Sequence, residues 1–326
     1  MSLTDKIFRI GSDKEFNDIS IEIFNYQYTN NKVYRQFCNL LKVEPEKITG
    51  IHQIPFLPIE FFKSQVIKTG DFKEECIFLS SGTTGQIQSK HYVKDLALYE
   101  TSFNKAFEQF YGDIKDYCIL ALLPSYMERK GSSLIYMVNH LMKSGKHQKS
   151  GFFLKNEQKL IENLQKLIKN GQKTILIGVS FALLDLAEKY QTDLSNIIIM
   201  ETGGMKGRRE EITREELHNI YKKQFNVKQI HSEYGMTELL SQAYSSGNGI
   251  FKTPAWMKVL MRDINDPFHI LGHHKTGGIN VIDLANIHSC SFIATQDLGK
   301  KTSDYEFEVL GRFDNSDIRG CNLLVS

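Results

Sequence analysis

The spacing of hydrophobic residues changes twice along the chain, which separates three regions with different expected secondary structure. In 15–26 and 32–41, apolar residues recur three and four positions apart, which predicts amphipathic helices. From 76 to about 240, short apolar runs alternate with helical patterns, which is typical of a mostly parallel sheet covered by helices. After 245, strand-like runs are separated by turns, which predicts a β-rich subdomain.

The alternation predicts a definite series of elements in the middle region. Strands are expected at 76–79, 117–123, 151–154, 174–179, 196–201 and 227–232. Helices are expected at 95–111, 132–142, 157–169, 181–190 and 213–225, the last with a capping box of Thr213 and Glu216. We therefore expect an α/β fold in four segments: a helical N-terminal region (1–75), an α/β core (76–245), a β-rich subdomain (246–305) and a short C-terminal tail (306–326).

Composition and charge narrow the class of protein. The 326 residues carry 40 Lys and Arg against 38 Asp and Glu, a balance that gives no strong field for nucleic acid or an anionic membrane. The five cysteines have no CxxC spacing, which argues against a zinc site. Their odd number in a chain of this length argues against a disulfide framework. No apolar run approaches the ~20 residues of a membrane span, and no signal-peptide pattern is present, so we expect a cytoplasmic protein.

A segment rich in glycine and hydroxyl groups follows the first predicted strand of the core. It reads Ser80-Ser81-Gly82-Thr83-Thr84-Gly85. Its glycines allow the backbone to approach a ligand closely, and hydroxyls with backbone N–H groups are the donors that an oligophosphate requires. The segment matches neither the Walker pattern nor GxGxxG. The alternative is a plain strand-to-helix turn.

The segment Ser232–Glu238 is a second candidate for nucleotide binding. The aromatic Tyr234 beside Gly235 can lie under a base, while Thr237 and Glu238 can hold a phosphate oxygen and Mg²⁺. The alternative is a helix N-terminus, where acidic residues are favourable.

Three further positions carry candidate chemistry. The pair Gly203 and Gly204 ends another predicted strand, and Asp297 lies in an expected turn, where it either accepts ribose hydroxyls or forms an Asx-turn. Cys321 lies beside Arg319 and Gly320, and a nearby cation favours the nucleophilic thiolate. The other four cysteines read as core or strand residues.

These segments occur together in an order that resembles the adenylate-forming superfamily of acyl-CoA synthetases, luciferases and peptide-synthetase adenylation domains. Within it, the sequence is most similar to the LuxE-type acyl-protein synthetases, which activate fatty acids in bacterial bioluminescence. The segments that carry the resemblance are SSGTTGQIQSKH (80–91), ETGGMKGRREEITREE (201–216), HSEYGMTELLSQAYS (231–245), GGINVIDLANIHSCSFIATQDLG (277–299) and GRFDNSDIRGC (311–321).

The resemblance implies that ATP, with Mg²⁺, activates a carboxylic acid, most naturally a fatty acid, as an acyl-adenylate. It implies these contacts: phosphates at Ser80, Ser81, Gly82, Thr83, Thr84, Gly85 and Thr237; adenine at Gly203, Gly204, Tyr234 and Gly235; Mg²⁺ at Glu238; ribose at Asp297 and Arg312. It further implies transfer of the acyl group to the thiol of Cys321 and then to an acyl-reductase or acyltransferase partner.

Two departures from the family pattern leave alternatives open. The phosphate segment continues with Gln86 where relatives have Pro-Lys, so Lys90 or His91 is expected to replace the lysine. After Arg312 the sequence has only a short tail instead of a lid domain of ~100 residues, so the lid is expected to be largely absent. The alternatives are an acyl- or aryl-CoA ligase of the phenylacetate–CoA ligase type, which the absent lid disfavours, and a non-catalytic nucleotide-binding partner of a reductase or transferase.

Overall fold

A computed structural model of the chain describes residues 2–81, 87–123, 131–153, 156–204 and 212–313. Residue contacts divide the chain into two compact units. The first, here called the α/β unit, is Phe72–Pro254, and the second, called the β-rich unit, combines Met1–Asp71 with Ala255–Ser326. The N-terminal helices and the C-terminal strands, which the sequence pattern treats as separate segments, thus belong to the same unit.

A sheet with five parallel strands forms the centre of the α/β unit. The strand order is β10-β9-β8-β7-β6-β4-β5, in which β9 pairs antiparallel to both β8 and β10. The bounds are β4 (Cys118–Leu122), β5 (Gly151–Phe152), β6 (Thr174–Val179), β7 (Ile197–Thr202), β8 (His231–Tyr234), β9 (Ala243–Ser245) and β10 (Ile250–Lys252). All residues of β4 and β6 are buried, which agrees with a parallel sheet that is covered on both faces.

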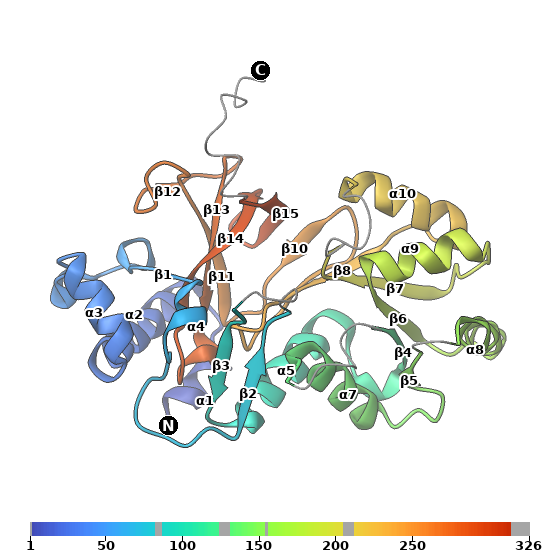
Figure 1. Cartoon of the computed structure of the whole chain (residues 1–326), viewed down its shortest axis with the longest axis horizontal. Coiled ribbons are helices and arrows are strands. Elements are labelled where there is room, and N and C mark those ends of the chain that lie inside the picture. The colour runs from blue at the N-terminus through green and yellow to red at the C-terminus, as the bar shows by residue number, and fades with distance from the viewer. Residues whose placement is uncertain (1, 82–86, 124–130, 154–155, 205–211, 314–326) are drawn as a thin grey trace. The chain divides into compact units, whose positions relative to one another are not determined.

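Helices cover both faces of this sheet. They are α5 (Leu96–Tyr111), α7 (Ser133–Gly145), α8 (Glu157–Lys169), α9 (Ser180–Lys189) and α10 (Arg214–Phe225), with a short 3₁₀ turn η3 (Ile114–Asp116). Figure 1 shows α9 and α10 on one side of the parallel strands and α5 and α7 on the other. The chain moves along the sheet in one direction from β4 to β5 and in the opposite direction from β5 through β6 and β7 to β8. Right-handed crossovers therefore place α7 on one face and α9 and α10 on the other. The α/β fold expected from the sequence is confirmed.

Side-chain caps explain where these helices begin. The side chains of Asp95, Ser132 and Asn156 accept backbone N–H groups at the starts of α5, α7 and α8. The predicted capping box of Thr213 and Glu216 is present at α10. The polar residues in the sequence therefore mark these helix starts to within a residue.

Two predictions about strands need correction. The strand expected at 227–232 is β8 at His231–Tyr234, because Asn226 adopts φ 53° and the N–H of Val227 bonds back to the carbonyl of Lys222, which ends α10. The sequence pattern also missed β3 (Lys90–Val93), which pairs antiparallel with β2 (Cys76–Leu79). Residues 80–89 therefore connect two paired strands, and the strand-to-helix turn is excluded.

The β-rich unit joins antiparallel strands to the N-terminal helices. Its strands are β1 (Leu57–Pro58), β11 (Met257–Arg262), β12 (Ile270–Leu271), β13 (Thr276–Asp283), β14 (Phe292–Lys301) and β15 (Glu306–Arg312). They follow the order β12-β11-β13-β14-β15, and β1 adds parallel to β14. Its helices are α1 (Leu3–Ile7), α2 (Asp13–Asn30), α3 (Lys32–Leu40) and α4 (Phe61–Ser64), with 3₁₀ turns η1 (Pro45–Lys47), η2 (Ile51–Gln53) and η4 (Leu284–Asn286).

Buried hydrogen bonds explain why helices and strands so distant in sequence belong together. The amide of Gln27 on α2 donates to the carbonyls of Asn286 and Ile287 and accepts from the N–H of Ser291. Beside them, the rings of Tyr34 and Phe292 stack 6.2 Å apart. Buried backbone groups of the β13–β14 connection thus find their partners on α2.

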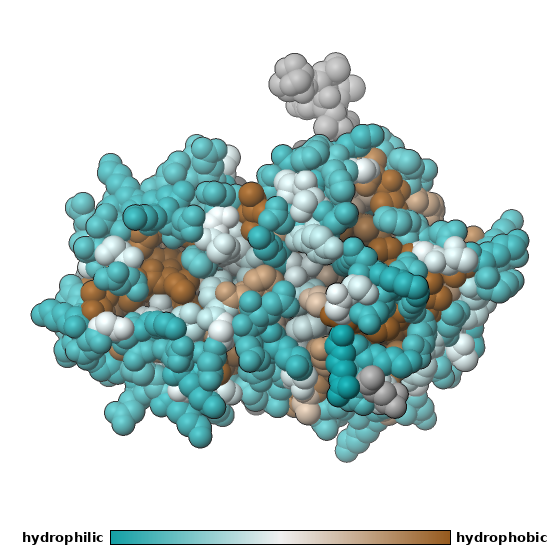
Figure 2. All heavy atoms as spheres, turned by 180° about the vertical axis from the view of Figure 1, so that it is seen from behind, coloured by the Kyte–Doolittle hydropathy of each residue, from teal (hydrophilic) through white to brown (hydrophobic). Residues whose placement is uncertain are grey.

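One face of the surface shows how polar and apolar residues are distributed. Hydrophilic residues cover most of the face in Figure 2, and hydrophobic residues reach the surface there in separate patches. In the described part of the chain, no helix combines the length and apolar character that crossing a membrane requires.

Candidate functional site

The ends of the glycine- and hydroxyl-rich segment are held together by hydrogen bonds. The N–H of Ser80 donates to the carbonyl of Ser89, and the N–H of Ser89 donates to Oγ of Ser80 at 2.8 Å. The amide of Gln88 adds a bond to the carbonyl of Ser80 at 2.6 Å. Of the six residues predicted to wrap phosphates, Ser80 and Ser81 are described, whereas Gly82, Thr83, Thr84 and Gly85 lie outside the described residues.

One side chain connects this segment to the second predicted site. His91 on β3 is buried, and its Nδ1 lies 2.7 Å from the carbonyl oxygen of Thr237. Because a carbonyl only accepts, Nδ1 carries the proton in this bond. The strand β3, which begins directly after Ser89, and the turn after β8 are thus neighbours, as a shared nucleotide site requires. His91 is one of the two residues expected to replace the family's lysine, and its Nδ1 makes this bond between β3 and the turn after β8.

The turn between β8 and β9 carries the second predicted site. Its Glu238 is buried, and Thr237 is half-buried. The ring of Tyr234 is also buried and packs edge-on against Phe251, 5.9 Å away. Ser232 to Tyr234 lie inside β8, and the residues that follow form a turn into β9, so the alternative of a helix N-terminus is excluded.

A buried carboxylate lies beneath this turn. Oε2 of Glu233 accepts the hydroxyl of Thr202 on β7 at 2.5 Å, and Oε1 would lie 2.4 Å from a Cβ at position 235. A side chain at 235 would therefore have to displace the carboxylate of Glu233. Burial raises the pKa of Glu233 to about 7, although the bond from Thr202 acts in the opposite direction.

The predicted glycine pair follows the end of β7. Gly203 adopts φ 71°, a conformation that favours glycine, and among the described residues a Cβ at Gly204 would meet no atom within 4 Å. Behind the pair, Oε1 and Oε2 of Glu201 lie 2.5 Å from Oγ of Ser180 and 2.7 Å from Nε2 of His218. All three side chains are buried. Sequence analysis missed this cluster because its members are 17 to 38 residues apart.

The predicted ribose ligands belong to the β-rich unit. Asp297 and Arg312 are opposite each other in β14 and β15, and Nε of Arg312 lies 3.3 Å from Oδ1 of Asp297. Asp297 is therefore a strand residue, and the Asx-turn proposed as its alternative is wrong. The side chain of Asp297 is 10% exposed, whereas that of Arg312 is 76% exposed.

The four cysteines in the described part of the chain are not activated. Burial raises the pKa of the Cys38 and Cys290 thiols to about 12 and also raises the pKa values of Cys76 and Cys118. These thiols are poor nucleophiles at neutral pH. Cys321, the predicted acyl carrier, lies outside the described residues.

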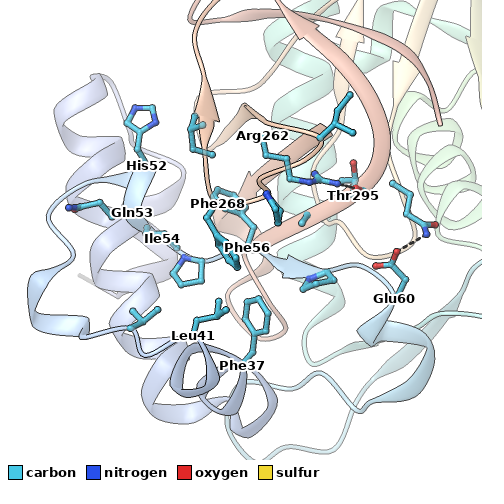
Figure 3. Close-up of a pocket in the computed structure, with 18 of the residues that line it drawn as sticks. Phe37, Leu41, His52, Gln53, Ile54, Phe56, Glu60, Arg262, Phe268 and Thr295 are labelled. Atoms are coloured by element: carbon cyan, nitrogen blue, oxygen red, sulfur yellow. Dashed lines mark hydrogen bonds between the residues drawn. The ribbon is translucent and has the colours of Figure 1, made fainter. Parts of the chain in front are cut away.

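A cavity of about 550 Å³ lies in the β-rich unit (Figure 3). Its lining is largely apolar. In Figure 3, Arg262 lies on one side of the lining residues, and Phe37 and Leu41 lie on the other. Gln296 also lines it and donates to Glu60 at 2.6 Å. Asp297 and Arg312 are not among the described residues that line it, so the cavity is distinct from the predicted ribose site.

Comparison with sequences of known proteins gives a consistent result. A family model described as acyl-protein synthetase, LuxE, matches residues 11–326. The long-chain-fatty-acid–luciferin-component ligase of Vibrio harveyi is 43% identical over 63 residues, which are 19% of this chain and 16% of that ligase.

Solved structures show the same fold at low identity. A 2-hydroxyisobutyryl-CoA ligase in complex with 2-HIB-AMP and CoA aligns with a TM-score of 0.67 at 12% identity, over 94% of this chain and 70% of that one. ATP-bound MatB from Rhodopseudomonas palustris aligns with a TM-score of 0.55 at 17% identity, over 72% of this chain and 47% of that one. The chain thus spans less than half of MatB and about a sixth of the Vibrio ligase. The match to the family model over nearly its whole length places the chain in the LuxE family of acyl-protein synthetases.

Proposed function

We propose that the chain activates a carboxylic acid with ATP and then carries the acyl group on Cys321. The observation that supports this most directly is the bond from His91 to the carbonyl of Thr237, which joins the base of the predicted phosphate segment to the predicted phosphate and Mg²⁺ turn. Family membership supports the acid–thiol ligase chemistry. The similarity to ATP-bound MatB supports the use of ATP.

In the first step, a carboxylate oxygen attacks the α-phosphorus of ATP. A new P–O bond forms, the bond from the α-phosphorus to the bridging oxygen breaks, and pyrophosphate leaves. The protein's part is to hold the phosphates in line with the acid and to stabilise the negative charge that develops, with donors from Ser80, Ser81 and Thr237.

Glu238 fits Mg²⁺ that arrives with the nucleotide. In the described part of the chain, no group of three or more His, Cys, Asp or Glu side chains is arranged to hold a metal ion. A nucleotide-bound Mg²⁺ needs only one or two protein carboxylates, because phosphates and water supply its other ligands. The buried carboxylate of Glu238, next to Thr237, matches that requirement. When bound, Mg²⁺ would neutralise part of the negative charge of the phosphates.

In the second step, the Cys321 thiolate attacks the carbonyl carbon of the acyl-adenylate. The C–S bond forms, the bond from carbon to the AMP oxygen breaks, and AMP leaves with the electron pair. The raised pKa values of the four described thiols favour Cys321 for this role by leaving it as the remaining cysteine. The acyl group is most naturally a fatty acyl group, and a reductase or transferase is the proposed acceptor.

Two variants test the two steps separately. Cys321→Ser should abolish stable labelling of the protein by a radioactive fatty acid and keep exchange of pyrophosphate into ATP. Glu238→Gln should lower that exchange about a hundredfold, because it removes charge from the metal ligand while keeping its shape. Unchanged labelling of Cys321→Ser would refute the acyl-carrier role, and turnover that requires coenzyme A would favour a CoA ligase.

A further inference from the structure

The end of β7 is held from both faces of the sheet just before the predicted adenine turn. Glu201 and Thr202 are neighbours, so their side chains point to opposite faces. Glu201 is bonded to Ser180 at the start of α9 and to His218 on α10, and Thr202 is bonded to Glu233 on β8. The backbone then leaves the sheet as Gly203 and Gly204.

Ser180 touches the turn itself. Its hydroxyl lies 2.5 Å from Oε1 of Glu201 and 3.2 Å from the carbonyl oxygen of Gly203. Because a hydroxyl has one proton, these contacts form a three-centre hydrogen bond with Glu201 as the closer acceptor. The hydroxyl of Tyr221 donates to the carbonyl of Ser180 at 2.6 Å, which fixes Ser180 from α10 as well.

This cluster is a costly way to obtain stability alone. Burying a carboxylate is unfavourable, and apolar residues of similar volume often stabilise a core as well or better. What a hydrogen-bonded cluster adds is a defined geometry, since each carboxylate oxygen of Glu201 has its own partner. The hydroxyl of Ser180 also bonds one backbone group outside the cluster, the carbonyl of Gly203, and so fixes its position.

We propose that Ser180, oriented by Glu201 and His218, is a positioning residue for nucleotide binding. It holds the carbonyl of Gly203 and so preorganises the Gly203–Gly204 turn on which the adenine of ATP rests. This inference depends on the proposed function, because it assumes that a nucleotide binds there.

Binding of AMP and ATP to the full chain, measured by isothermal titration calorimetry, tests the proposal. Ser180→Ala removes the hydroxyl and should weaken AMP binding about tenfold, because the carbonyl of Gly203 loses one hydrogen bond that holds the turn in place. Glu201→Gln keeps the shape of the side chain and an oxygen to accept the Ser180 hydroxyl, so AMP binding should stay within about threefold of wild type.

Two further variants separate positioning from stability. Ser20→Ala removes another buried serine hydroxyl that donates to a carbonyl, that of Phe16 at 2.6 Å, and should lower Tm without changing AMP affinity. Tyr221→Phe removes only the hydroxyl that bonds the carbonyl of Ser180 and should weaken AMP binding about threefold. This milder variant keeps the proposal testable if Ser180→Ala does not fold.

The outcomes distinguish this inference from the function on which it rests. Weakened binding in Ser180→Ala and Tyr221→Phe but not in Ser20→Ala supports the positioning role. If Ser180→Ala and Tyr221→Phe bind AMP within twofold of wild type, the positioning role is wrong and the proposed function stands. If the wild-type chain binds neither AMP nor ATP, both are wrong.

Discussion

The buried carboxyl group of Glu233 should make the stability of this protein depend on pH in an unusual direction. Its pKa in the folded chain is about 7, against an ordinary value of 4.5, because burial disfavours the charged form. Between these two values the unfolded chain has released this proton and the folded chain still holds it. Stability therefore falls as pH rises through this window.

The size of the effect follows from the width of the window. Each pH unit changes the free energy of unfolding by about 1.4 kcal/mol, so the full shift from 4.5 to about 7 corresponds to about 3 kcal/mol. Glu233→Gln removes the titrating proton and keeps an oxygen to accept the hydroxyl of Thr202. The variant should therefore gain stability relative to wild type from pH 5 to pH 7 and hold a constant advantage above that.

Urea unfolding followed by circular dichroism at pH 5, 6, 7 and 8 measures this difference. Glu162→Gln, which removes an exposed carboxylate from α8, is the matched control and should run parallel to wild type. If Glu233→Gln also runs parallel to wild type over this range, the carboxyl group is not held protonated by burial and the reasoning is wrong.

Three further substitutions test contacts that stabilise each unit from within. Gln27→Ala should lower the free energy of unfolding by about 1–3 kcal/mol in urea, since it leaves buried partners in the β13–β14 connection without their bonds; a loss below about 0.5 kcal/mol would contradict this. Phe103→Ala should lower the free energy of unfolding by about 3–5 kcal/mol in the same assay, because the ring is fully buried between Tyr99 and His140. A loss as small as that of a surface substitution would show that neighbouring side chains fill the space left by the ring. Gly178→Ala in β6 should lower the free energy of unfolding by about 1–3 kcal/mol, because its Cβ would lie 2.7 Å from Cγ of the buried Leu183. An unchanged free energy of unfolding would mean that Leu183 moves aside at little cost.

Most elements of the α/β unit could be predicted from the sequence because their signals are local. Apolar spacing located α8 and β6 at their observed bounds, and the cap at Thr213 located the start of α10. The strand β3 was missed because Lys90–Val93 is short and pairs with β2 across a gap of ten residues. A short strand depends on its partner more than on its own pattern.

The candidate site also combines features that the sequence predicts with contacts that only the folded structure creates. The sequence by itself determined which residue types lie in the turns proposed to bind nucleotide, since glycines, hydroxyls and carboxylates at strand ends are visible as motifs. Only the tertiary structure decided that His91 joins two of these turns, that Glu233 lies beneath Gly235, and that Ser180 and His218 converge on Glu201. These contacts link residues whose separation in sequence carries no periodic signal, because they arise from which strands and helices lie next to one another in space rather than from the conformation of any one strand.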